Sequence, residues 1–169
     1  MNTITVKPNI SLYERFLEGI FDHPFNKGMT SESIFFGSFF VNFRIIDINT
    51  FGKWEYRLIP VPDDGINLYD ARKLCESDNW EAAKNEHLLS FSAEFPSEQE
   101  KISIIQLGSS VNFIDEFGGP AYFTYIGKKD DRRFYTYISY EVGCNTGFIH
   151  KKSDLFVPPL QLLSVRKIL

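Results

Sequence analysis

Cysteine and histidine residues offer the most reactive side chains in this sequence. The chain has two cysteines and three histidines, and only Cys144 and His150 are close together. A thiolate nucleophile needs a base within hydrogen-bonding reach and a site that stabilises an oxyanion. If residues 147–152 form a strand, Cys144 lies in the turn before it and His150 is roughly 10 Å or more away. We therefore expect no nucleophilic cysteine at this position.

The same residue types lack the spacing of a metal site. No Cys-x-x-Cys, His-x-His or His-Glu-x-x-His sequence is present, and these spacings matter because they place two ligands on one side of the ion. His87 shares a predicted helical side with Trp80 and Phe91, which indicates a structural histidine. The glycines of 108–110 and 118–120 match neither a Walker loop nor a dinucleotide-binding motif. We expect no metal and no cofactor.

Carboxylates are the remaining candidates for acid–base catalysis. The pairs Asp63-Asp64 and Asp115-Glu116 fall in predicted turns or loops, where a solvated charge is the usual state. Glu141 differs, because it falls on a predicted strand whose neighbours are tyrosines. A pocket lined by aromatic side chains, with Glu141 and Tyr137 as its polar groups, would suit a small-ligand-binding protein or a hydrolase. This pocket is the alternative to the function inferred below.

The composition indicates an aromatic-rich globular protein without a basic face. The chain has 169 residues, of which 43% are hydrophobic and 16% aromatic, and its formal net charge is −4. This length suits one core, so we expect residues 1–169 to form a single domain. Nucleic-acid binders usually carry a basic patch, so we expect no nucleic-acid partner. The sequence has no signal-peptide core and no apolar run of roughly 18 residues, so we expect a cytoplasmic protein that does not enter a membrane.

Short elements separated by Gly, Pro, Asn and Asp predict an α+β fold. Helices are predicted over 10–20, with Arg15 on the outward side, over about 67–76, and from Asp78, which would cap the first turn. The segment 155–169 fits a helix or a strand. Because short turns join neighbouring strands, we expect an antiparallel sheet of about 5–7 strands with two or three helices packed on it. The predicted strands are 34–47 and its partner 53–61, then 101–107, 121–127, 133–142 and 147–152.

The predicted hairpin over 121–142 carries the candidate binding surface. Alternation along its second strand gives an apolar face, from Phe134 to Val142, and a second face that carries Tyr135, Tyr137 and Glu141. Arg133 lies at the edge of the second face. Tyrosine and arginine are enriched at binding hot spots, so this face suits a protein partner. If helices cover it, the tyrosine rings belong to the core instead.

Together these features favour a non-enzymatic protein that binds and inhibits another protein. Small acidic intracellular inhibitors such as bacterial immunity proteins are similar in kind, because they have few motifs, carry acidic loops and often neutralise a basic nuclease toxin. No motif here matches a particular immunity family. Acidic turns would speed association with a basic toxin domain, and the tyrosines would supply affinity. The partner-binding residues on this interpretation are Tyr135, Tyr137, Glu141, Arg133, Asp63, Asp64, Asp115 and Glu116.

Overall fold

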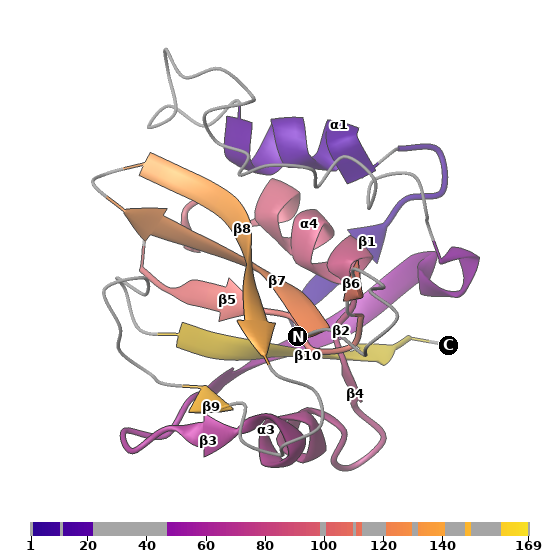
Figure 1. The fold of residues 1–169 in the computed structure, drawn as a ribbon. Coiled ribbons are helices and arrows are strands. Elements are labelled where there is room, and N and C mark those ends of the chain that lie inside the picture. Colours follow the sequence, from indigo (N-terminus) through magenta and orange to yellow (C-terminus); the bar gives the residue numbers. More distant parts are fainter. Residues whose placement is uncertain are drawn as a thin grey trace.

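A mixed β-sheet forms the centre of the molecule in the computed structural model (Figure 1). The structure describes residues 2–10, 12–21, 47–98, 101–109, 111–112, 121–129, 132–140, 148–149 and 160–168. The sheet contains β1 (Thr3–Val6), β2 (Gly52–Pro60), β4 (Glu81–Ala82), β5 (Ser103–Ile105), β6 (Val111–Asn112), β7 (Ala121–Lys129), β8 (Arg132–Tyr140) and β10 (Leu160–Lys167). A separate two-stranded sheet pairs β3 (Ile66–Asn67) with β9 (Phe148–Ile149).

β10 lies in the interior of the main sheet. Its residues 161–167 pair antiparallel with β2, and its residues 160–162 pair in parallel with β5 on the other edge. β5 then pairs with β7, and β7 pairs with β8 along its whole length. The predicted α+β class is confirmed, but the sheet is mixed and not purely antiparallel. The parallel pair joins segments more than fifty residues apart in the sequence, so no short turn between neighbours could reveal it.

Helices cover both faces of this sheet. The helix α1 (Leu12–Phe16) continues as a π-helical turn, η1 (Leu17–Phe21), and lies beside α4 (Asn85–Glu94) on one face. α3 (Leu68–Cys75) lies on the other face with β3 and β9, as Figure 1 shows. The helices predicted over 10–20 and 67–76 are therefore confirmed. Among the described residues, no helix is long and apolar enough to cross a bilayer.

Two hydrophobic cores result, one on each side of the sheet. Successive β10 side chains alternate between them, with Leu163 and Val165 packing towards α4, and Leu160 and Leu162 packing towards α3. Neighbouring strands divide their side chains in the same way. Since both faces are covered, the interior strands read as continuous apolar runs, which explains why 155–169 fitted two structures in the sequence.

The helix predicted from Asp78 is wrong in its start. Asp78 and Asn79 have φ angles of 56° and 64°, which belong to the left-handed region, and Glu81 and Ala82 form β4 against β10. The helix begins only at Asn85. Asp and Asn favour both helix caps and left-handed turns, so the sequence could not distinguish the two uses.

Arg15 and the N-terminal strand also depart from the prediction. Arg15 is buried, and its guanidinium donates to the Thr5 carbonyl at 3.0 Å and pairs with Glu94 at 3.5 Å. β1, which the sequence analysis missed, pairs antiparallel with β2. The predicted partner strand of β2 lies mostly in 34–46, outside the described residues.

A close contact between η1 and α4 gives a first prediction. A Cβ added to Gly19 would lie 2.5 Å from the carbonyl carbon of Ser92, so Gly19→Ala should destabilise the fold by about 1–3 kcal/mol despite the better helix propensity of alanine. Urea denaturation measures the effect. Lys7→Ala, at an exposed position after β1, is the control and should change stability by less than about 0.5 kcal/mol. A Gly19→Ala variant as stable as wild type would contradict the packing.

Candidate functional site

The structure describes only some of the predicted binding residues. Asp63 and Asp64 are exposed in the turn between β2 and β3, which closes with a 2.9 Å hydrogen bond from the Gly65 amide to the Pro62 carbonyl. Three residues are described by their backbone alone, namely Arg133, Tyr135 and Tyr137. Three lie outside the described residues, namely Asp115, Glu116 and Glu141.

The predicted hairpin is present as β7 and β8. Its register pairs Tyr137 with Thr124 and Tyr135 with Ile126. Thr124 and Ile126 are fully buried on the side of α4, and Tyr125 is buried on the side of α3. Burial raises the pKa of the Tyr125 hydroxyl to about 12. Both faces of β7 are therefore covered at these positions, while the exposure of the β8 tyrosines stays a prediction.

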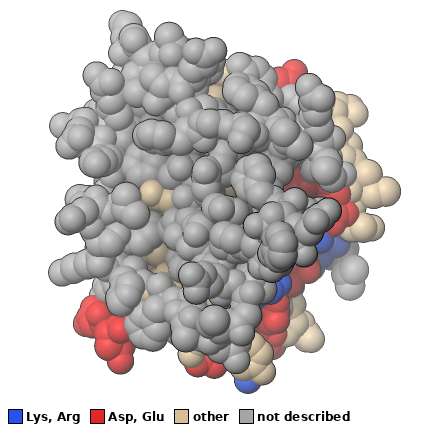
Figure 2. Space-filling model, in the orientation of Figure 1, with Lys and Arg blue, Asp and Glu red and all other residues tan. Residues whose placement is uncertain are grey.

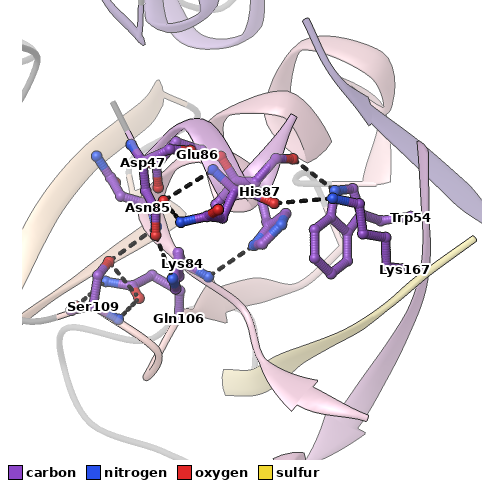
Figure 3. Close-up of polar contacts among 11 residues, drawn as sticks. Asp47, Trp54, Lys84, Asn85, Glu86, His87, Gln106, Ser109 and Lys167 are labelled. Carbon is purple, nitrogen blue, oxygen red and sulfur yellow. Dashed lines mark hydrogen bonds and ion pairs between the residues drawn. The ribbon is translucent and has the colours of Figure 1, made fainter. Parts of the chain in front are cut away.

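A polar network surrounds the start of α4 and concentrates most of the reactive groups that the structure describes (Figure 3). Its centre is Asn85, whose backbone amide donates to Ser109 Oγ at 3.0 Å and whose side-chain oxygen accepts from Thr124 Oγ1 at 3.0 Å. Gln106 donates to Thr124 Oγ1 at 3.0 Å and to the Ser109 carbonyl at 2.7 Å. Its own oxygen accepts from the Ser109 amide at 2.9 Å. These groups satisfy one another, which a buried polar cluster requires.

The network continues into the segment before β2. Lys84 Nζ pairs with Asp47 Oδ2 at 2.6 Å, and Glu86 Oε1 accepts the Asp47 backbone amide at 2.9 Å. The hydrogen bond from Lys84, with a second from the Asn49 amide, lowers the pKa of Asp47 to about 2. The charged groups therefore fasten a surface turn to the first turn of α4.

His87 is a deeply buried member of this region, with 1% of its surface exposed. Its Nδ1 accepts the Lys84 backbone amide at 3.0 Å, and its ring meets Trp54 edge-on with centroids 4.5 Å apart. Among the described residues, Nε2 has no hydrogen-bond partner. Burial, reinforced by the charge of Lys84, lowers the pKa of His87 to about 3. The imidazole is therefore neutral at physiological pH and caps a helix.

These observations assign the α4 network to structure. Cys75 is likewise buried, and burial raises the pKa of its thiol to about 12, so it stays protonated at neutral pH. Within the described part of the chain, no cluster of His, Cys, Asp or Glu could hold a metal ion.

The outside of α3 and its flanking turns is the most distinctive described surface. We call residues 62–81 the α3 surface. They contain six acidic and two basic residues, a formal charge of −4, which equals the charge of the whole chain. Tyr69 is 60% exposed and Leu74 is 42% exposed, so two of the four exposed large hydrophobic residues described lie on this one helix. Its inner face packs through Ala71 and Cys75.

Arginine side chains from the main sheet fasten this surface. The Arg57 guanidinium donates to the Leu74 carbonyl at 3.0 Å and to Ser77 Oγ at 2.9 Å, which satisfies groups at the end of α3. The same guanidinium stacks on Trp80 at 4.6 Å from the ring centroid. Arg166, which also pairs with Glu55, stacks on Trp80 at 4.9 Å. Trp80 is thus held between two cations at the rim of the surface.

Sequence reasoning placed Trp80 on the buried side of a helix and gave no role to Tyr69. The sequence signal for this surface is the negative charge of residues 62–81, and the prediction includes only Asp63 and Asp64 from it. Exposure of Tyr69 and Leu74 depends on which side of α3 meets the sheet, and short helices leave that choice to tertiary packing.

Comparison with known proteins gives no relative: no family model, no curated protein and no solved structure matches this chain.

His87 gives a prediction for acid stability. Its pKa is lower in the folded protein than the ordinary value of 6.5, so the unfolded chain binds a proton that the folded protein does not. Below pH 6.5 this group should therefore reduce the free energy of unfolding by about 1.4 kcal/mol per pH unit. The measurement is urea denaturation at a series of pH values down to about 4.5. This limit lies above the pH range in which Asp47 titrates. His87→Leu should flatten the dependence, and an unchanged slope would contradict the assignment.

Arg57 gives a prediction for the stability of the α3 surface. Arg57→Ala removes the helix-end hydrogen bonds and one of the cations on Trp80, so it should cost about 1–3 kcal/mol of unfolding free energy. Arg57→Lys keeps the charge but lacks the planar guanidinium, so its free energy of unfolding should lie between those of wild type and Arg57→Ala. Arg72→Ala, on the exposed side of α3, is the matched control, with an expected effect below about 0.5 kcal/mol. Equal effects of Arg57→Ala and Arg72→Ala would argue against the anchoring role.

Proposed function

We propose that this protein acts by binding another protein, and that its partner is basic. The class of protein that fits is a small inhibitor comparable to bacterial immunity proteins, which occupy the surface of a nuclease-type toxin. The observation that carries this proposal is the concentration of exposed acids with exposed apolar side chains on the α3 surface.

Electrostatics supports a basic partner. The α3 surface bears the same formal charge as the whole chain, so the remaining residues together are balanced. Figure 2 shows Asp and Glu side chains along the lower part of the molecule, where β3 and α3 lie in Figure 1. Opposite charges on two partners steer their encounter and raise the association rate, an effect that salt screens.

The reactive side chains that the structure describes serve the fold, which supports a function in binding and not in catalysis. His87, Asn85 and Gln106 point into contacts that stabilise the fold, and the Cys75 thiol is buried beneath α3. The accessible groups on the α3 surface are mainly carboxylates and apolar side chains, with Arg72 and Lys73 as its two exposed cations. Such a surface is suited to complementarity with a partner, with aromatic side chains supplying buried area.

The test is capture by the full chain from a lysate of the cell that produces it, followed by identification of the bound protein. A basic partner held in a one-to-one complex, whose nuclease activity falls as the complex forms, is the expected result. Capture of no stoichiometric partner, or of an acidic one, would contradict the proposal.

Charge variants provide the matched control on association kinetics. Asp64→Lys changes the charge by the same amount as Glu14→Lys, but only Asp64 belongs to the α3 surface. We expect Asp64→Lys to lower the association rate about threefold or more at low ionic strength, and Glu14→Lys to have a smaller effect. Surface plasmon resonance with the captured partner measures both rates. Equal effects of the two variants would show that steering depends on net charge alone.

A further inference from the structure

The geometry points to Tyr69, Leu74 and Trp80 as the contact through which the α3 surface holds a basic, amphipathic segment of another protein. This inference rests on the proposed function and deepens it, because it assigns affinity to the helix α3 in place of the β7–β8 hairpin.

The apolar side chains are exposed although the helix has a well-packed inner side. Ala71 and Cys75 are fully buried, whereas Tyr69 and Leu74 leave 60% and 42% of their surface in solvent. An eight-residue helix could satisfy its own packing with polar residues at these positions. An exposed apolar patch with a polar rim is typical of an interaction surface, and Tyr69 and Leu74 each add exposed apolar area to the α3 surface.

The aromatic members of this contact are held in place before any partner arrives. Lys73 Nζ lies 4.2 Å from the centroid of the Tyr69 ring, one helical turn away. Trp80 is fixed between Arg57 and Arg166. The Asn67 side chain accepts the Asp70 amide at 2.9 Å and caps the other end of α3. A contact that is already ordered loses little entropy on binding, and tyrosine and tryptophan are enriched among the residues that dominate interfaces.

Charge complementarity identifies the occupant as cationic. Residues 62–81 carry six acidic side chains against the two cations Arg72 and Lys73, so their formal charge is −4 even though Lys73 lies over the Tyr69 ring. Asp63 and Asp64 extend the acidic surface beyond the start of α3. A segment with lysine or arginine on one side and leucine-like residues on the other would meet both kinds of group. A second copy of this chain would instead bring acids against acids, which is unfavourable.

A defined probe tests the inference without knowledge of the natural partner. The probe is an amphipathic helical peptide with lysine on one side and leucine on the other, added to the ¹⁵N-labelled full chain. We expect the amide resonances of residues 69–81 to shift, and added salt to weaken binding. The same peptide with glutamate in place of lysine should not bind.

Substitutions then separate this contact from the rest of the surface. Tyr69→Ala and Leu74→Ala, combined, should raise the Kd for the lysine peptide and for any captured partner at least about tenfold. Ile48→Ala is the matched control, because Ile48 is 72% exposed and lies on a different element, and it should change the Kd less than about twofold. Circular dichroism verifies that the variants fold.

Four results would overturn the inference. The first is binding of the glutamate peptide as tightly as the lysine peptide, and the second is a set of shifted resonances that lies away from 69–81. Alternatively, sedimentation may reveal a dimer of this chain that Tyr69→Ala dissociates, which would make a second copy the occupant. A basic partner captured with equal affinity by wild type and by the double variant would overturn the α3 contact while leaving the proposed function intact.

Discussion

Burial of α4 is the constraint on which the rest of the structure depends. Residues 85–92 of this helix are all buried, because the sheet lies on one side and α1 with η1 on the other. A helix placed there brings unpaired backbone amides at its start into the interior, where each needs a partner. His87 and Ser109 accept two of these amides, and Asn85, Thr124 and Gln106 link the helix to β7. The polar residues around the start of α4 are therefore those that make a buried helix end tolerable.

On our proposal, recognition falls to the opposite side of the sheet. α3 is covered on one side only, and arginines from β2 and β10 connect it to the strands that α4 packs against. The Arg57 and Arg166 side chains therefore start on strands of the main sheet and end against α3 or the turn that follows it. A binding surface on such a support keeps its shape, because movement of α3 would break contacts to Arg57 and Ser164 at once.

The sequence predicted the class and five of the ten described strands (β2, β5, β7, β8 and β9), because period-two alternation and turn residues are local signals. It located the hairpin of β7 and β8, the helices near 10–20 and 67–76, and the exposed turn at Asp63 and Asp64. The prediction failed where the structure depends on contacts between distant segments. The parallel pairing of β5 with β10, the burial of Arg15 against Glu94 and the left-handed turn at Asp78 depend on contacts between residues far apart or on tertiary packing. The candidate surface was missed because exposure of Tyr69 and Leu74 is a property of packing and not of spacing.

The interior position of β10 has a consequence for synthesis of the chain. This strand is hydrogen-bonded to β2 on one edge and to β4 and β5 on the other, yet it follows all of them in the sequence. Until β10 has been synthesised, no strand connects β2 with β4 and β5. The sheet therefore closes only after residues 160–167 have emerged, and until then the nascent protein exposes two incomplete apolar layers, a state that is prone to aggregation.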